Sequence, residues 1–226
     1  MAKNEQKEHG GLVFELENLA LGARRIRYEV LAGIFQEQGI PFSAVQYSRY
    51  CLGRPDDYLP GLVEKVGYTA APATMVAERL RGESLSRLMQ KDCALDANLK
   101  AWLDDAKAHS MPIAAVTCLP QEAATSITKR LAFETWGIRV LYSTDTQSFR
   151  SPAAWLSAAQ VLARHPTHCL ALVTSASWAR AALAASFKGI AIPDEFTEFE
   201  NFAGMNYILS SLQELKADAT FKKLGL

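Results

Sequence analysis

Apolar and polar positions over the first 92 residues predict one strand followed by a series of helices. Residues 11–16 form an apolar run typical of a buried strand. Residues 22–38 then carry apolar side chains at helical spacing, and Gly39 ends that segment as a helix C-terminus prefers. The pattern stays helical to residue 92, with breaks at 53–55, Gly67 and Gly82. It predicts helices at 43–50, 56–67, 72–81 and 83–90.

From residue 95 onward, helices alternate with short apolar strands. The expected helices are 98–109, 120–132, 152–163, 176–185 and 210–216, and the expected strands are 112–116, 138–142, 168–173, 188–192 and 206–209. This alternation predicts a parallel sheet covered by helices on both faces. Because ligands of such sheets bind at the carboxyl ends of the strands, the segments that follow each strand are the candidate site.

Charge and composition argue against some classes of function. The chain has 226 residues with 24 basic and 24 acidic side chains, and this zero net charge argues against a nucleic-acid binder or a polybasic membrane anchor. Residues 1–10 are expected to be a flexible N-terminus without the apolar core of a signal peptide. The four cysteines are far apart and form no CxxC pair, which favours reduced thiols. We expect a cytoplasmic monomer or homodimer.

The first predicted strand ends in a motif that carries chemistry in a known family. The run Phe14-Glu15-Leu16-Glu17-Asn18-Leu19-Ala20 resembles the motif Phe-Asp-x-Asp-Gly-Thr-Leu of the haloacid dehalogenase superfamily. The resemblance implies that Glu15 replaces the nucleophilic Asp, which takes up the phosphoryl group. It implies that Glu17 replaces the general acid/base, whose backbone carbonyl helps to bind magnesium. At the nucleophile position, the extra methylene moves the carboxylate by roughly an ångström or more, a misplacement that can cost about a hundredfold in rate.

The second and third motifs are partly kept. The run Pro112-Ile113-Ala114-Ala115-Val116-Thr117 resembles the strand whose terminal hydroxyl holds the phosphoryl group, so Thr117, Cys118 and Asn18 are candidate phosphate contacts. Residues 151–159 resemble the helix that follows the family's Lys or Arg. Phe149 stands at the position of that cation, and Arg150 is one residue away.

The fourth motif, Glu-Asp-Ser-x-x-Gly, has lost its acids. It matches residues 173–178 with Val173 and Thr174 in place of the two carboxylates and Trp178 in place of the glycine. Magnesium prefers carboxylate oxygens in near-octahedral geometry. The resemblance therefore implies magnesium as the family's cofactor, held here by Glu15 and Glu17, with weak or absent binding.

The resemblance covers nearly the whole chain and is strongest for phosphoglycolate phosphatases and β-phosphoglucomutases. It implies an α/β fold with a Rossmann-like three-layer parallel-sheet core formed by residues 11–21 and 93–226. It also implies an inserted α-helical cap formed by residues 22–92. A small phosphorylated ligand or another anion is the expected partner, and neither nucleic acid nor a membrane is expected.

Several candidate residues have a second, plainer interpretation. Glu15 and Glu17 alternate along a strand end, so they could point to opposite sides as solvated loop residues. Thr117 could cap the next helix or meet an anion. Arg150 could be a surface residue before a helix.

Two further residues could extend the site. Asp194 follows a predicted strand and could return a carboxylate to the cleft and rescue a metal site. Arg54 falls where the family's cap carries a substrate-contacting loop, although a surface arginine in a turn is the plainer interpretation.

Three functions remain open at this level. The favoured one is a non-catalytic binding or regulatory protein that has lost, or strongly weakened, magnesium-dependent phosphoryl transfer. The second is an active but atypical phosphatase that uses Glu15 or Glu17 on a small phosphorylated metabolite, with a relocated metal ligand such as Asp194. The third is a structural subunit whose helical cap forms a dimer or partner surface.

Overall fold

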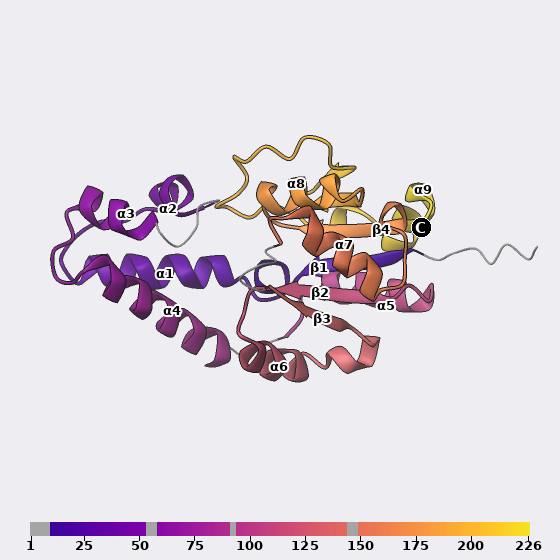
Figure 1. Ribbon diagram of the computed structural model, residues 1–226, viewed down its shortest axis with the longest axis horizontal. Coiled ribbons are helices and arrows are strands. Elements are labelled where there is room, and N and C mark those ends of the chain that lie inside the picture. Colours follow the sequence, from indigo (N-terminus) through magenta and orange to yellow (C-terminus); the bar gives the residue numbers. More distant parts are fainter. Residues whose placement is uncertain (1–9, 53–57, 91–93, 144–148) are drawn as a thin grey trace, which may run out of the picture.

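The computed structural model describes residues 10–52, 58–90, 94–143 and 149–226. Figure 1 shows a parallel sheet flanked by helices and a block of four helices beyond the carboxyl ends of its strands. The strands are β1 (Gly11–Glu15), β2 (Ile113–Thr117), β3 (Arg139–Tyr142), β4 (Cys169–Val173), β5 (Lys188–Ala191) and β6 (Tyr207–Ile208). The helices of the block are α1 (Ala23–Gln36), α2 (Ala44–Cys51), α3 (Tyr58–Val66) and α4 (Ala73–Gln90). The helices beside the sheet are α5 (Ala97–Ala108), α6 (Gln121–Arg130), α7 (Pro152–Val161), α8 (Ala176–Ala184) and α9 (Ala217–Leu224).

The sheet has the strand order β3-β2-β1-β4-β5-β6, and every neighbouring pair is parallel. After β1 the chain builds β2 and β3 on one side, and then it crosses over to build β4, β5 and β6 on the other. The direction of building therefore reverses between β1 and β4. In open parallel sheets this switch point is where a crevice opens at the carboxyl ends of the strands.

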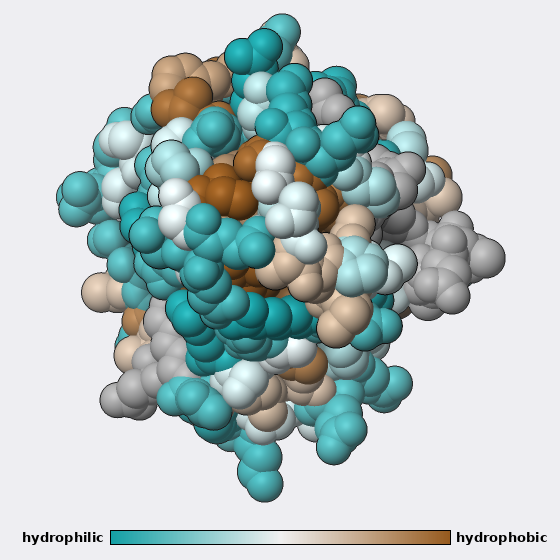
Figure 2. Space-filling model, turned by 90° about the vertical axis from the view of Figure 1, so that its left-hand side faces the viewer, coloured by the Kyte–Doolittle hydropathy of each residue, from teal (hydrophilic) through white to brown (hydrophobic). Residues whose placement is uncertain are grey.

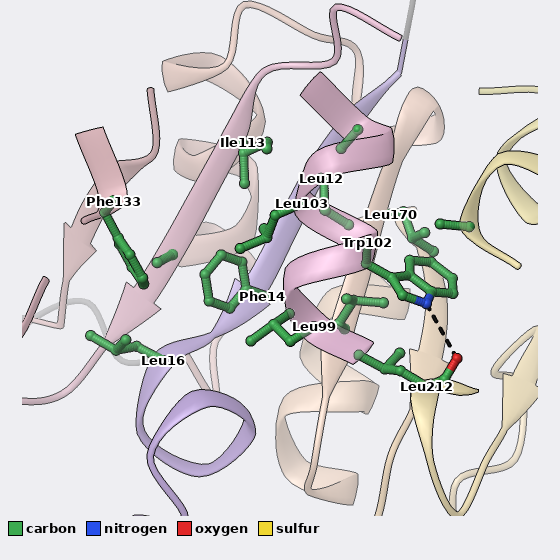
Figure 3. Close-up of a cluster of buried hydrophobic side chains, with 14 of the residues drawn as sticks. Leu12, Phe14, Leu16, Leu99, Trp102, Leu103, Ile113, Phe133, Leu170 and Leu212 are labelled. Atoms are coloured by element: carbon green, nitrogen blue, oxygen red, sulfur yellow. Dashed lines mark hydrogen bonds between the residues drawn. The ribbon is translucent and has the colours of Figure 1, made fainter. Parts of the chain in front are cut away.

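Two hydrophobic clusters pack against opposite faces of the sheet. Leu12 and Phe14 of β1 lie in one cluster and Val13 in the other, because successive strand residues point to opposite faces. Helices α5, α6 and α9 cover the first face, and α7 and α8 cover the second. In the first cluster the Trp102 indole donates a hydrogen bond to the Leu212 carbonyl at 3.3 Å (Figure 3). The predicted Rossmann-like three-layer core is confirmed.

The helical block, residues 23–90, has a hydrophobic cluster of its own. Val30, Leu31 and Ile34 of α1 pack against residues of α2, α3 and α4. Figure 2 views the molecule from the free end of this block, where mostly hydrophilic side chains surround a recessed apolar area. The block therefore turns most of its apolar side chains inward, as amphipathic helices do.

The predicted helices differ from the structure in two places. The expected break at Gly82 is wrong, because α4 runs through it from Ala73 to Gln90. A glycine in a helix costs only about 1 kcal/mol, and Val76, Leu80 and Leu88 of α4 are buried on either side of it. The helix expected at 210–216 is a short 3-10 turn at residues 212–214, started by a capping box between Ser211 and Glu214. The true helix, α9, begins at residue 217.

Three of the four cysteines, Cys51, Cys118 and Cys169, lie in the described residues, and no disulfide bond joins any of these three. Cys93 and residues 1–9 lie outside the described residues. Within the described ranges, every helix is too short or too polar to cross a membrane.

Candidate functional site

The candidate site lies at the switch point of the sheet, where β1 and β4 run side by side. Glu15 is the last residue of β1, and Thr174 directly follows β4. Phe14 and Leu172 are paired in register, so the two strands end at nearly the same level. Both Glu15 and Thr174 are buried, with exposed fractions of 2% and 3%. The sequence-predicted first and fourth motifs therefore meet here.

Three groups of the protein bind the Glu15 carboxylate. Oε2 accepts a hydrogen bond from the Thr174 backbone N–H at 3.0 Å and another from the Thr174 hydroxyl at 2.6 Å. Oε1 accepts one from the Asn18 side-chain amide. The longer side chain of glutamate thus reaches across from β1 to the end of β4, and both carboxylate oxygens are engaged by the protein itself.

Glu17 belongs to the π-helical turn of residues 16–20 and is also buried. Its Oε1 accepts a hydrogen bond from the Cys118 backbone N–H. Its Oε2 has no hydrogen-bond partner among the described residues. Desolvation by burial, helped by the nearby charge of Glu15, raises the pKa of Glu17 to about 7, although the bond from Cys118 opposes this shift. Glu17 can therefore exchange a proton near neutral pH.

The plainer interpretation of these two glutamates, as solvated residues on opposite sides of a strand, is wrong. The strand ends at Glu15, and the chain then winds into the turn of residues 16–20. Alternation applies only to extended backbone. Both carboxyl groups consequently lie inside the protein, close enough for the charge of one to raise the pKa of the other.

Thr117 and Cys118 lie at the neighbouring strand end, after β2. The Thr117 side chain is fully buried, and its hydroxyl accepts a hydrogen bond from the Leu119 N–H at 3.1 Å. It therefore holds the turn that leads into α6. Cys118 is exposed as a whole residue, although its thiol is partly buried. Desolvation and the charges of Glu17 and Glu15 raise the pKa of its thiol to about 12, so the thiol stays protonated at neutral pH.

Aromatic side chains fill the third- and fourth-motif positions. Phe149, which stands where the family has a cation, is 2% exposed, and its ring lies 5.4 Å from that of Trp178 and 6.3 Å from that of Trp155. Val173 is fully buried in the same cluster. Arg150 is exposed, and its positive charge acts on the Cys118 thiol by lowering its pKa. Arg150 therefore stays near the second-motif turn without taking the place of Phe149.

Sequence reasoning missed one residue of the site, Arg24. It is the second residue of α1 and is 8% exposed. Its Nη2 donates a hydrogen bond to the Thr174 hydroxyl at 3.0 Å and lies 4.0 Å from Glu15 Oε1. Its Nη1 forms an ion pair with Asp194. The candidate rescue carboxylate Asp194 thus does reach the site, where it binds a guanidinium group.

A physical signal for Arg24 was present in the sequence. The N-terminus of a helix carries partial positive charge and disfavours cations. Arg24 and Arg25 nevertheless stand together in the first turn of α1, which has no acidic residue. Such a placement requires carboxylates from elsewhere, and these are Asp194 for Arg24 and Glu195 for Arg25.

The donor set around Glu15 fits a guanidinium group better than magnesium. Within the described ranges, no three His, Cys, Asp or Glu side chains are grouped so that they could hold a metal ion. Asp194 pairs with Arg24, Glu15 Oε1 lies 4.0 Å from Arg24 Nη2, and the fourth motif offers a hydroxyl in place of a carboxylate. Arg54, the predicted substrate contact, lies outside the described residues.

A cavity of about 420 Å³ lies beside this network and gives it a path to solvent. Its walls include Asn18, Thr174, Asp194 and Ser210. Asp194 is 29% exposed, whereas Arg24 is not part of the cavity wall. Small solutes can therefore reach the Asp194 side of the network.

Known proteins similar to this chain were found both by sequence and by structure. No family model matches the chain. It is 24% identical over 212 residues to YhcW of Bacillus subtilis (strain 168), a candidate phosphatase, and this match covers 91% of the chain and 93% of that protein. A conserved haloacid dehalogenase-like protein of unknown function from Agrobacterium tumefaciens superposes with a TM-score of 0.78 at 14% identity, covering 95% of this chain and 99% of that one. CbbY from Rhodobacter sphaeroides, in complex with phosphate, superposes with a TM-score of 0.73 at 16% identity, covering 95% and 99%.

Proposed function

Because the chain has the fold of the haloacid dehalogenase hydrolases, as its sequence motifs implied, we propose that it is a ligand-binding or regulatory protein built on that fold. In this proposal magnesium-dependent phosphoryl transfer is lost or strongly impaired. The observation that carries the proposal is that hydrogen bonds from the protein occupy both carboxylate oxygens of Glu15. A nucleophilic carboxylate must direct an oxygen at the substrate, but both oxygens of Glu15 accept hydrogen bonds from Thr174 and Asn18.

The loss of the third-motif cation supports the same proposal. A cation beside the nucleophile stabilises the negative charge of a transferring phosphoryl group. Phe149 occupies that position and is buried between Trp155 and Trp178. A small backbone shift cannot bring Arg150 there without displacing this packed aromatic side chain.

We place the ligand at the turn after β2, under the helical block, which would then act as the cap. A small phosphorylated molecule or another anion would bind between the start of α6 and Arg150, with Cys118 and Thr117 beside it. The start of α6 suits an anion, because Pro120 precedes it and no side chain of the described residues caps it. CbbY, which shares this fold, was crystallised with phosphate.

An assay of phosphate-ester hydrolysis tests this proposal. We expect the wild-type protein to hydrolyse p-nitrophenyl phosphate in the presence of MgCl2 no faster than E15Q and no faster than E198Q, a variant of an exposed carboxylate in the β5–β6 loop. Isothermal titration with inorganic phosphate should show binding that is weakened by R150A. Turnover well above background that E15Q abolishes and E198Q preserves would contradict the proposal.

Glu17 favours a second candidate function, an active but atypical phosphatase. A buried carboxyl group with a pKa of about 7 and one oxygen free of hydrogen bonds among the described residues is suited to general acid/base catalysis. In that case Glu15 would have to exchange its bonds to Thr174 for a bond to the substrate. Hydrolysis that requires both Glu15 and Glu17 would establish this alternative.

A further inference from the structure

Arg24 holds a central position in the site. Its guanidinium group lies between a carboxylate at the end of β1, a hydroxyl at the end of β4 and a carboxylate after β5, contributed by Glu15, Thr174 and Asp194. These three elements are neighbours in the sheet. A single buried cation therefore joins three adjacent strand ends at the switch point.

The same strand ends are where the family motifs place a metal ion. Glu15 stands at the first-motif acid and Thr174 at a fourth-motif acid, and Asp194 brings a further carboxylate to this edge of the sheet. A magnesium ion at this point would face the guanidinium of Arg24 and be repelled by it. The two cations are alternatives for one position.

We propose that the Arg24 guanidinium permanently occupies the place of the magnesium ion, so that this chain carries its site cation as a side chain and needs no metal to complete the site. Guanidinium suits the oxygens that are present. It is planar, it always carries a positive charge, and its N–H groups point outward in a fixed fork toward acceptors. Magnesium instead requires about six oxygens in octahedral geometry.

The departures from the family motif form a consistent set around Arg24. Asn18, which replaces the motif glycine, accepts a hydrogen bond from the Arg24 backbone N–H at 2.9 Å and donates one to Glu15. Thr174, which replaces a motif acid, donates to Glu15 and accepts from Arg24. Glu15, Asn18, Arg24 and Thr174 thus form a closed ring of hydrogen bonds. The replacement at Thr174 removes a carboxylate that a metal site would use, and Asn18 and Thr174 both supply partners that the ring needs.

This inference goes beyond the proposed function, because a built-in cation could serve a binding site or an atypical hydrolase. Hydrolysis without added metal would contradict the proposed function and leave the role of Arg24 intact. Conversely, magnesium binding to an inactive wild-type protein would contradict the inference alone.

The test compares thermal unfolding of wild type, R24A and R25A in millimolar MgCl2, in millimolar guanidinium chloride and in NaCl of equal ionic strength. R25A is the matched control, because Arg25 is the next residue, is 58% exposed and pairs with Glu195 at 2.5 Å. We expect R24A to have a lower Tm, which guanidinium raises by several degrees and NaCl does not. Wild type and R25A should not respond to any of the three salts. The cavity beside Asp194 gives the added cation its route into R24A.

Two results would overturn the inference. One is a rise in the Tm of wild type with MgCl2 that equals or exceeds that of R24A. The other is a folded R24A protein that does not respond to guanidinium. If R24A does not fold, R24M, which keeps most of the side-chain volume, replaces it. Its thermal unfolding is measured in the same salts and judged by the same two criteria. Isothermal titration of wild type with MgCl2 is an independent measurement. Heat of binding at millimolar concentrations would overturn the inference by itself.

Discussion

The ring of Phe196 lies 5.2 Å from the ring of Tyr47, centroid to centroid, although Phe196 belongs to the loop after β5 and Tyr47 to α2 of the helical block. Phe196 is 2% exposed and also packs against Tyr28 of α1 at 5.3 Å. Asp194 and Glu195, the two residues before it, pair with Arg24 and Arg25. Three consecutive residues of the loop after β5 thus contact the first helix of the block.

Replacing Phe196 by alanine should therefore destabilise the protein strongly. Truncating a buried phenylalanine typically costs about 3–5 kcal/mol, because the lost contacts leave a cavity. Phe199, three residues later, is 78% exposed, so F199A is the matched control and should change the free energy of unfolding by less than about 0.5 kcal/mol. Urea unfolding followed by circular dichroism measures both. Equal midpoints for F196A and F199A would show that Phe196 does not join the two parts energetically.

No periodic signal marks Phe196 in the sequence, and this explains why its role could not be predicted. The strands β1, β2 and β4 are buried along their whole length and apolar except at the carboxyl ends of β1 and β2, so their positions are visible in the sequence. Phe196 is one apolar residue in a loop, and its partners Tyr28 and Tyr47 belong to helices far away in the sequence. Contacts of that kind depend on tertiary structure alone.

The candidate site also combines residues whose proximity could be predicted from the sequence with one, Arg24, whose position could not. Glu15, Glu17, Thr117 and Thr174 lie at or just after the ends of predicted strands, and parallel strands bring their carboxyl ends together, so their proximity could be predicted. Arg24 lies on a helix outside those segments. Its partners Thr174 and Asp194 come from two other strand ends, and no spacing along the chain relates them.

Gly82 offers a direct test of why the predicted helix break is absent. A methyl group added at this position in α4 would have no heavy atom within 4 Å outside its own helix turn, and the position does not require a positive φ. G82A should therefore stabilise the protein by about 0.5–1 kcal/mol by reducing the entropy of the unfolded chain. Gly67 provides the contrast, because its φ of +71° is strained for alanine, so G67A should be destabilising. Thermal unfolding of the two variants should show shifts of opposite sign, and a destabilised G82A would indicate that α4 is interrupted there in solution.

Restoring the family's cation at residue 149 should not restore a working site. Phe149 is packed against Trp155 and Trp178, so F149K would bury an ammonium group among aromatic rings. We expect a loss of about 3 kcal/mol or more in the free energy of unfolding and no gain in phosphatase activity. F149L, which stays apolar, is the control and should lose less than F149K. A well-folded F149K with new hydrolytic activity would show that the aromatic cluster around residue 149 can accommodate a cation.

Glu17 should make the protein less stable as the pH rises. Burial raises the pKa of its carboxyl group from 4.5 to about 7, so between these values the folded state holds a proton that the unfolded state has released. The stabilising effect of that proton is complete below pH 4.5, falls as the pH rises and is lost above about 7. E17Q cannot titrate. Relative to wild type, E17Q should gain about 3 kcal/mol in the free energy of unfolding between pH 4.5 and pH 8.

The matched control for this pH dependence is E37Q, because the change at Glu37 has the opposite sign. A hydrogen bond from Arg79 lowers the pKa of Glu37, so its charged form stabilises the folded state above pH 4.5 and that contribution is lost as the pH falls. E37Q should therefore differ from wild type at neutral pH and approach it in acid, whereas E17Q should differ most in mild alkali. Urea unfolding at several pH values separates the two. A constant difference between E17Q and wild type across this range would mean that Glu17 is ionised throughout, and the general-acid role in the alternative function would then fail with it.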